Sequence, residues 1–254
     1  SAASGACSRR VDGIAMGHYF ASNGWMENGR SCMPEYESTT QTSVPCPKCG
    51  QDQDVEATTT VRPGESALDE LFHGELNKAV CSHCGTEFLL QVPVVFRDDE
   101  GRYLVYCLPV DNKHADQQVE DQMESLTDEV FSEFDTEDVP DCRLTLNRRQ
   151  FIEKIAIHLK GLDDRLIEYV KYQLYQKGEI DAVRSELLYD FSDNDPTRIQ
   201  FLIFDRETGE ASAGADLPRE VYDELAETFL SDEGLAEEVE KLFPSYNVTV
   251  EKLL

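Results

Sequence analysis

Two cysteine pairs, in residues 46–50 (Cys-Pro-Lys-Cys-Gly) and residues 81–85 (Cys-Ser-His-Cys-Gly), constrain the fold of this chain more than any other feature. A C-x-x-C turn offers two thiolates from one short loop, and two such turns supply the four soft ligands of a tetrahedral zinc ion. A glycine follows each pair, as is common where the chain leaves such a turn with positive φ. The pattern therefore predicts one structural zinc ion, held by Cys46, Cys49, Cys81 and Cys84.

A redox dithiol and disulfides are the alternative explanations for these cysteines. A redox C-x-x-C pair sits at the start of a helix, where the dipole lowers the thiol pKa, whereas residues 86–92 after the second pair have a strand pattern. Disulfides require an oxidising compartment, and the N-terminal residues show no signal-peptide pattern. We therefore expect a cytoplasmic protein with a metal site.

The spacing between the two pairs departs from that of a simple zinc ribbon. Between Cys49 and Cys81 lie 31 residues, more than the roughly 15 to 20 of simple ribbons. The β-branched residues of segment 55–61 predict a strand, which Pro63-Gly64 ends, and Ser66 then precedes apolar residues at helical spacing. The sequence predicts a short helix, capped by Ser66 and ending near Gly74, inserted between the two cysteine turns.

These residues resemble the CpXC-domain family of bacteria and archaea. The resemblance is carried by the first cysteine pair, by residues 73–77 (His-Gly-Glu-Leu-Asn) ahead of the second, and by residues 162–168 (Leu-Asp-Asp-Arg-Leu-Ile-Glu). It extends over about residues 44–230. In the family the second pair also usually reads Cys-Pro, so Ser82 is a small departure. The resemblance implies a zinc-ribbon-like fold and supplies no catalytic residues.

The remaining pattern predicts an α+β protein in which an expanded zinc-ribbon sheet precedes an αα-hairpin and a second small antiparallel sheet with a C-terminal helix. Asn147 and Asp163 are expected to cap the two helices of the αα-hairpin. Residues 1–39 are expected to be disordered, or to precede a true start at one of three methionines, and residues 40–110 to form the ribbon, with order beginning at Val44. Residues 111–231 are expected to form a helical and α+β portion that opens with a surface helix. Residues 232–254 are expected to form an acidic tail with an edge strand near its end.

Candidate chemistry outside the cysteines is sparse. His73 and His83 lie near the cysteine turns and could each replace a ligand or act as a base, but four thiolates already fill a tetrahedron. Asp163-Asp164-Arg165 could bind a cation or perform acid–base work, although acidic residues in a first helical turn more simply complement the helix dipole while the arginine pairs locally. Tyr169, Tyr172 and Tyr175 form a stripe that either packs in the core or faces a partner.

Charge limits the partners of this chain. The net charge is -28, and residues 40–110 carry 5 basic against 11 acidic residues, whereas phosphate contacts require a basic face. Nucleic-acid binding is therefore disfavoured, and no apolar run is long enough to span a membrane. We expect a protein-interaction or adaptor module with a structural zinc rather than an enzyme. An enzyme with an unrecognised pocket is the alternative, and the oligomeric state stays open.

Overall fold

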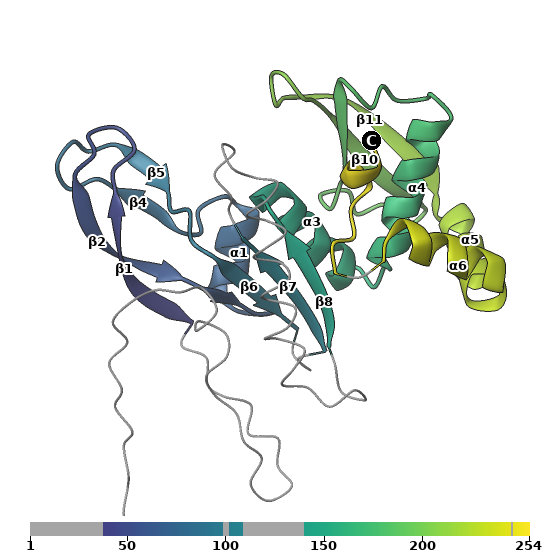
Figure 1. Ribbon diagram of the computed structural model, residues 1–254, viewed down its shortest axis with the longest axis horizontal. Helices are drawn as coiled ribbons and strands as arrows, with labels where there is room; N and C mark the ends of the chain where they lie inside the picture. The colour runs from purple at the N-terminus through teal and green to yellow at the C-terminus, as the bar shows by residue number, and fades with distance from the viewer. Residues whose placement is uncertain (1–37, 99–101, 109–139, 245) are drawn as a thin grey trace, which may run out of the picture. The chain divides into compact units, whose positions relative to one another are not determined.

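The computed structural model describes residues 38–98, 102–108, 140–244 and 246–254, and has the predicted α+β class (Figure 1). The predicted surface helix in residues 111–140 and nearly all of the segment 1–39 lie outside these residues. The strands are β1 (Thr39–Pro45), β2 (Asp52–Thr58), β3 (Thr60–Val61), β4 (Lys78–Val80), β5 (Glu87–Leu89), β6 (Val94–Arg97), β7 (Tyr103–Cys107), β8 (Asp141–Thr145), β9 (Ser185–Tyr189), β10 (Arg198–Asp205) and β11 (Ala211–Pro218). The helices are α1 (Ser66–Phe72), α3 (Arg148–Leu159), α4 (Asp164–Gln176), α5 (Arg219–Ser231), α6 (Glu233–Leu242) and the 3-10 helix η2 (Val250–Leu253).

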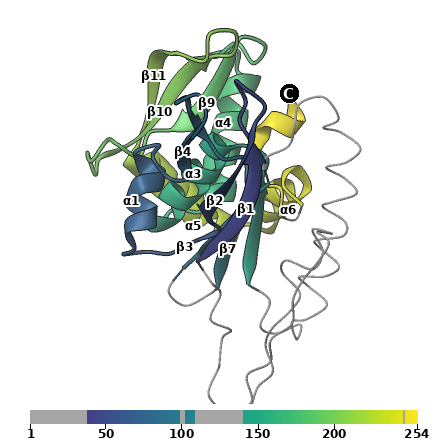
Figure 2. The same ribbon diagram turned by 90° about the vertical axis from the view of Figure 1, so that its left-hand side faces the viewer.

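Two antiparallel hairpins carry the cysteine turns. β1 pairs with β2 over seven residues (Figure 2), and β4 pairs with β5 over three (Figure 1), as separate two-stranded sheets. The prediction that order begins at Val44 was wrong, because β1 starts at Thr39. Its first residues are threonine, glutamine and serine, which alternate between exposed and half-buried without an apolar pattern. Threonine nevertheless favours strands through its branched Cβ.

Asn77 joins the two hairpins. Its side-chain oxygen accepts from the Thr58 amide at 2.7 Å, and its side-chain nitrogen donates to the Thr58 carbonyl at 2.8 Å. Its own carbonyl accepts from the Leu90 amide, and its φ of 61° is a left-handed value that asparagine tolerates better than most residues. One side chain thus satisfies the end of β2, where the predicted strand 55–61 divides into β2 and β3.

A four-stranded mixed sheet follows the ribbon, in the order β3-β6-β7-β8. The ribbon was expected to grow into this sheet, but the two are separate in hydrogen bonding. The predicted inserted helix is α1; Ser66 is its first residue rather than its cap, since Glu65 occupies the cap position without a side-chain bond. Apolar residues from α1, the sheet and α3 form one core, which includes Val61, Leu71, Phe96, Val105, Phe151 and Ile155.

The αα-hairpin is confirmed as α3 and α4. Asn147 accepts from the Gln150 amide and Asp163 from the Arg165 amide, so both predicted caps are present. The predicted local pairing of Arg165 is not observed among the described residues, where its Nε is buried without a hydrogen-bond partner. The caps follow from sequence because each is a contact within three residues.

The second sheet has the order β11-β10-β9 and packs with α3, α4, α5 and α6 around a second core. The segment expected as an acidic tail contains α6 and contributes Val239, Phe243, Val248 and Val250 to this core. The expected terminal edge strand was wrong, because residues 250–253 form η2. The Val250 amide donates to Glu168 Oε2 at 2.8 Å, which fixes η2 on α4.

The tyrosine stripe belongs mainly to the core. Tyr175 is buried, while Tyr169 and Tyr172 are half-buried and pack against the second core. The Tyr169 hydroxyl donates to Glu238 on α6 at 3.3 Å. The interpretation of all three tyrosines as partner-facing anchors is therefore wrong for Tyr175.

Replacing Tyr175 with phenylalanine is expected to lower the free energy of unfolding by about 1 to 3 kcal/mol. Its hydroxyl accepts from the Leu187 amide at 2.9 Å and donates to the Ser185 carbonyl at 3.2 Å, so the variant leaves a buried donor unpaired. Tyr172→Phe is the matched control, because the Tyr172 hydroxyl makes no hydrogen bond to the described residues. Urea unfolding measures both, and equal stability losses would contradict the assignment.

Among the described residues, no helix is both long and apolar enough to cross a membrane.

Candidate metal centre

The two cysteine turns have the same backbone geometry. In the first, the Cys46 amide donates to the Gln51 carbonyl and the Gly50 amide to the Cys46 carbonyl, each at 2.9 Å. In the second, the corresponding bonds run from Cys81 to Thr86 and from Gly85 to Cys81, also at 2.9 Å. Gly50 and Gly85 both have a φ of 71°, a left-handed value that glycine adopts without the steric penalty that other residues meet. Short-range geometry thus preforms both halves of the site.

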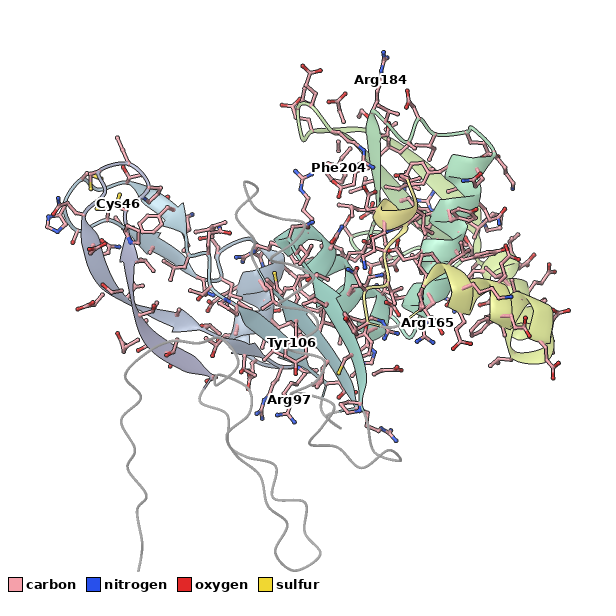
Figure 3. All side chains as sticks on the ribbon, viewed as in Figure 1. Cys46, Arg97, Tyr106, Arg165, Arg184 and Phe204 are labelled. Atoms are coloured by element: carbon pink, nitrogen blue, oxygen red, sulfur yellow. The ribbon has the colours of Figure 1, made fainter. Side chains whose placement is uncertain are left out.

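The four predicted cysteines come together at the ends of the two hairpins, where Figure 3 shows Cys46. Their Sγ atoms all lie within 4.8 Å of one another. The Cys46–Cys84 and Cys49–Cys81 sulfur pairs are each 3.7 Å apart. Thiolates about 2.3 Å from a central zinc ion lie roughly 3.8 Å apart in a tetrahedron. The arrangement can therefore hold a metal ion, and these distances fit zinc.

Neighbouring polar groups lower the pKa of Cys46 and Cys84 and favour their thiolates, whereas the pKa of Cys49 is raised to about 12 because desolvation and hydrogen bonds with the other sulfurs outweigh the Gln51 amide. The Lys48 amide approaches Cys46 Sγ at 3.4 Å, and the Thr86 hydroxyl lies 3.3 Å from Cys84 Sγ. The Thr86 hydroxyl and amide together lower the pKa of Cys84 to about 6. Across the site, the Ser82 amide donates to Gln53 Oε1 at 2.9 Å and links the second turn to β2. These are the supporting contacts expected around metal ligands.

The histidines considered from sequence lie outside the sulfur cluster. Among the described residues, the group that could hold a metal contains four cysteines and no histidine. His73 is exposed at the end of α1, where its Nδ1 contacts the Asp69 carbonyl, and His83 is exposed at the tip of the second turn. Cys107 is buried, and burial raises its pKa to about 11, as expected for an unreactive core cysteine.

A buried network of charged side chains lies between α3, α4 and β8, and sequence reasoning missed it. Asp164, predicted as a helix-end carboxylate, is 4% exposed and accepts from Arg143 Nε at 2.8 Å and Arg143 Nη2 at 2.9 Å. Lys154 Nζ lies 3.3 Å from Asp164 and 3.0 Å from Glu168. Asp164 is thus a structural ion-pair residue, while Asp163 is the helix cap.

The network continues along α4. Lys171 Nζ lies 2.9 Å from Glu168 Oε1 and 2.6 Å from Glu153 Oε1, and all of these side chains are buried. Three cations and three carboxylates therefore compensate one another within the protein interior. A sequence signal existed, because Asp164, Glu168 and Lys171 recur at helical spacing beside the apolar residues of the core face.

The network makes stability depend on pH. Burial alone would raise the pKa of Asp164, but Lys154 and Arg143 outweigh it and hold the pKa at about 2, below the ordinary 3.8. A depressed carboxylate pKa stabilises the fold above its unfolded value, and this stabilisation disappears as the pH falls toward 2. We expect Asp164 to account for about 2 kcal/mol of lost unfolding free energy between pH 4 and pH 2.

Urea unfolding of the wild type and of Asp164→Asn at both pH values measures this contribution. The variant should be less stable at pH 4 and should lose less stability on acidification. Since the wild type and the variant share every other titrating group, the difference between their losses of unfolding free energy from pH 4 to pH 2 gives the contribution of Asp164. Parallel pH dependence in the two chains would contradict the assignment.

A comparison with protein-family models matches residues 44–171, as a CpXC protein. This range contains the cysteine cluster, strands β2, β4 and β5 of the two hairpins, and the side chains of the buried charge network. It ends before the limit near residue 230 expected from the resemblance. No curated protein and no solved structure matches the chain. The matched half of the sequence, with its four gathered cysteines, shows that the chain belongs to the CpXC family.

Proposed function

We propose that the chain is a protein-interaction module whose ribbon is stabilised by a structural zinc ion bound to Cys46, Cys49, Cys81 and Cys84. The observation that carries the proposal is the set of four cysteine sulfurs gathered within 4.8 Å of one another, two pairs of which are 3.7 Å apart. A zinc ion with four cysteine ligands has no open position for substrate or water, unlike catalytic zinc sites, which keep one. The ion would cross-link two hairpins rather than perform chemistry.

The hairpins themselves support a structural role for the metal. β1–β2 and β4–β5 are separate two-stranded sheets, and such hairpins are marginally stable in water on their own. Their mutual contacts include single polar links such as Asn77 to Thr58 and Ser82 to Gln53. A metal ion shared by the two cysteine turns would cross-link the two hairpins, and the polar contacts would add to this cross-link.

Charge indicates the class of partner. With a net charge of -28, the protein repels polyanions and attracts basic or mixed-charge protein surfaces. The proposed partner is therefore another protein rather than a nucleic acid.

The function is tested by affinity capture with the full chain, immobilised with its metal. Capture of a stoichiometric basic or mixed-charge protein is expected, and its retention should fall as salt rises through about 0.15 M, where the Debye length is about 8 Å. Tight binding of DNA or RNA at that salt concentration would overturn the proposal. So would turnover of a small substrate that survives purification.

A further inference from the structure

The sheet β11-β10-β9 has two edges, and the β9 edge is closed by side chains. The Leu187 amide donates to the Tyr175 hydroxyl at 2.9 Å, and this hydroxyl donates to the Ser185 carbonyl. The Tyr189 amide donates to Glu153 Oε1 at 2.5 Å. The outward amides of Leu187 and Tyr189 and the outward carbonyl of Ser185 are thus satisfied within the protein.

In the part of the chain that the structure describes, β11 has no strand paired to its outer edge. The Asp190 amide donates to the Gln200 carbonyl, so the backbone of Gln200 faces β9. The amide and carbonyl groups of successive residues point to opposite sides of a strand. Those of Phe201 therefore point toward β11, and those of its partner Ala215 point back toward β10. The neighbouring Gly214 and Asp216 therefore direct their amide and carbonyl groups outward, and no hydrogen-bond partner for them occurs among the described residues.

The usual protection of an exposed edge is missing between the ends of β11. Natural edges are blocked by lysines, prolines or bulges, because unpaired amides and carbonyls accept another strand. Here an irregularity in pairing between Ile203 and Phe204 lies at one end, and Pro218 lies at the other. The residues between them contain no lysine, arginine or proline. About five residues of edge remain available to an added strand.

Gly214 marks the centre of this edge without being required by the fold. A Cβ atom there would meet the Phe201 carbonyl at 3.5 Å and Gln200 Nε2 at 3.7 Å, which are ordinary contacts, and its φ is not in the left-handed region. Glycine inside a strand often occurs where another backbone approaches closely. Opposite Gly214 in β10 lies Leu202, which is half-buried. The missing side chain leaves Leu202 open to an apolar residue of an added strand.

We propose that the β11 edge binds an extended segment of a partner protein by strand addition, with an apolar residue opposite Gly214 and a basic residue beside Asp216. Main-chain hydrogen bonds would provide affinity and alternate side chains would provide specificity. This surface rests on the proposed interaction function and adds the location and the chemistry of the partner.

Charge favours a basic segment over a second copy of this chain. Residues 207–218 carry Glu207, Glu210 and Asp216 and no basic residue. Each copy has a net charge of -28, so the field of one chain opposes the approach of another. A lysine two positions from the apolar residue would lie on the same face as Asp216, because side chains on one face recur every second residue.

The test uses the full chain and a blocked peptide of sequence Lys-Thr-Val-Thr-Lys at about 1 mM, since single short strands bind weakly. Hydrogen exchange is followed amide by amide by NMR. In the free protein, the Gly214 and Asp216 amides are expected to exchange rapidly and the Leu187 amide slowly. The peptide should slow the exchange of the Gly214 and Asp216 amides by about tenfold and leave that of the Leu187 amide unchanged.

The variant Gly214→Pro should abolish the protection of the Asp216 amide by the peptide, whereas the matched Gly214→Ala, which keeps the backbone amide, should retain it. The peptide Glu-Thr-Val-Thr-Glu should protect neither.

Slow exchange of both amides in the free protein would overturn the proposal, because the edge would already be covered. If that protection rises with protein concentration, a second copy is the occupant and the basic-partner proposal fails. Unchanged exchange with the lysine peptide also overturns it. A captured partner that binds folded Gly214→Pro as tightly as the wild type would overturn this surface alone. If the lysine peptide protects the Gly214 and Asp216 amides but the immobilised chain captures no protein in a salt-sensitive way, the proposed function is overturned instead.

Discussion

Replacing Cys46 and Cys81 with serine is expected to reduce bound zinc from about one ion per chain to nearly none and to unfold both ribbon hairpins. Cys46 and Cys81 come from different turns, so the double variant weakens each half of the site. Structural zinc contributes an apparent binding free energy of about 10 to 16 kcal/mol in zinc-finger peptides, and that energy is coupled to folding. The two separate hairpins should therefore lose protection from exchange, while the core formed by α3, α4 and β9–β11 retains it.

Metal analysis of freshly purified protein, combined with hydrogen exchange, provides the measurement. Cys142→Ala is the matched control, since Cys142 is a buried free cysteine that lies outside the sulfur cluster. It should keep the metal. A wild-type zinc content far below one ion per chain, or unchanged content in the double variant, would contradict the site.

Glu168→Gln is expected to lower the free energy of unfolding by about 3 to 5 kcal/mol. Glu168 Oε1 accepts from both Lys154 and Lys171, and Oε2 accepts from the Val250 amide, so its charge compensates two buried lysines and its second oxygen holds η2. Removing one partner of a buried ion pair leaves uncompensated charge in a medium of low dielectric constant. The glutamine is nearly isosteric, so the loss reports charge rather than packing volume.

The chain contains a matched exposed pair. Lys241 and Glu237 on α6 lie 3.2 Å apart with side chains that are 74% and 69% exposed. Glu237→Gln should change the stability by less than about 1 kcal/mol, because water already solvates both charges. Denaturant unfolding of the two variants compares identical substitutions in opposite environments. Similar effects in both would contradict the role of burial, and adding Lys171→Met to Glu168→Gln should recover part of the loss.

The sequence by itself determined the features that depend on a few consecutive residues. Both cysteine turns, the glycines after them, and the caps Asn147 and Asp163 were predicted correctly. Their hydrogen bonds join residues at most five positions apart, so local spacing specifies them. The αα-hairpin and the second small antiparallel sheet were also predicted, since apolar periodicity reports the buried face of each element.

Only the tertiary structure decided which charged and polar residues become internal. The partners of Glu168 include Lys154 and Val250, which are 14 and 82 residues away in the sequence. Charged residues are usually exposed, so composition alone assigns them to the surface, and the segment after Asp232 was accordingly expected to be an acidic tail. Four of its apolar residues, Val239, Phe243, Val248 and Val250, are instead buried in a core built with α4 and β9–β11.

The edges of the second sheet depend on the same long-range information. Tyr175 and Glu153 close β9 from two different helices, and nothing in the strand sequence indicates that protection. The sequence of β11 does not show which of its backbone groups are left unpaired. Hydrogen bonding at a sheet edge is decided by the elements that pack beside it, and these are brought there by burial of distant apolar residues.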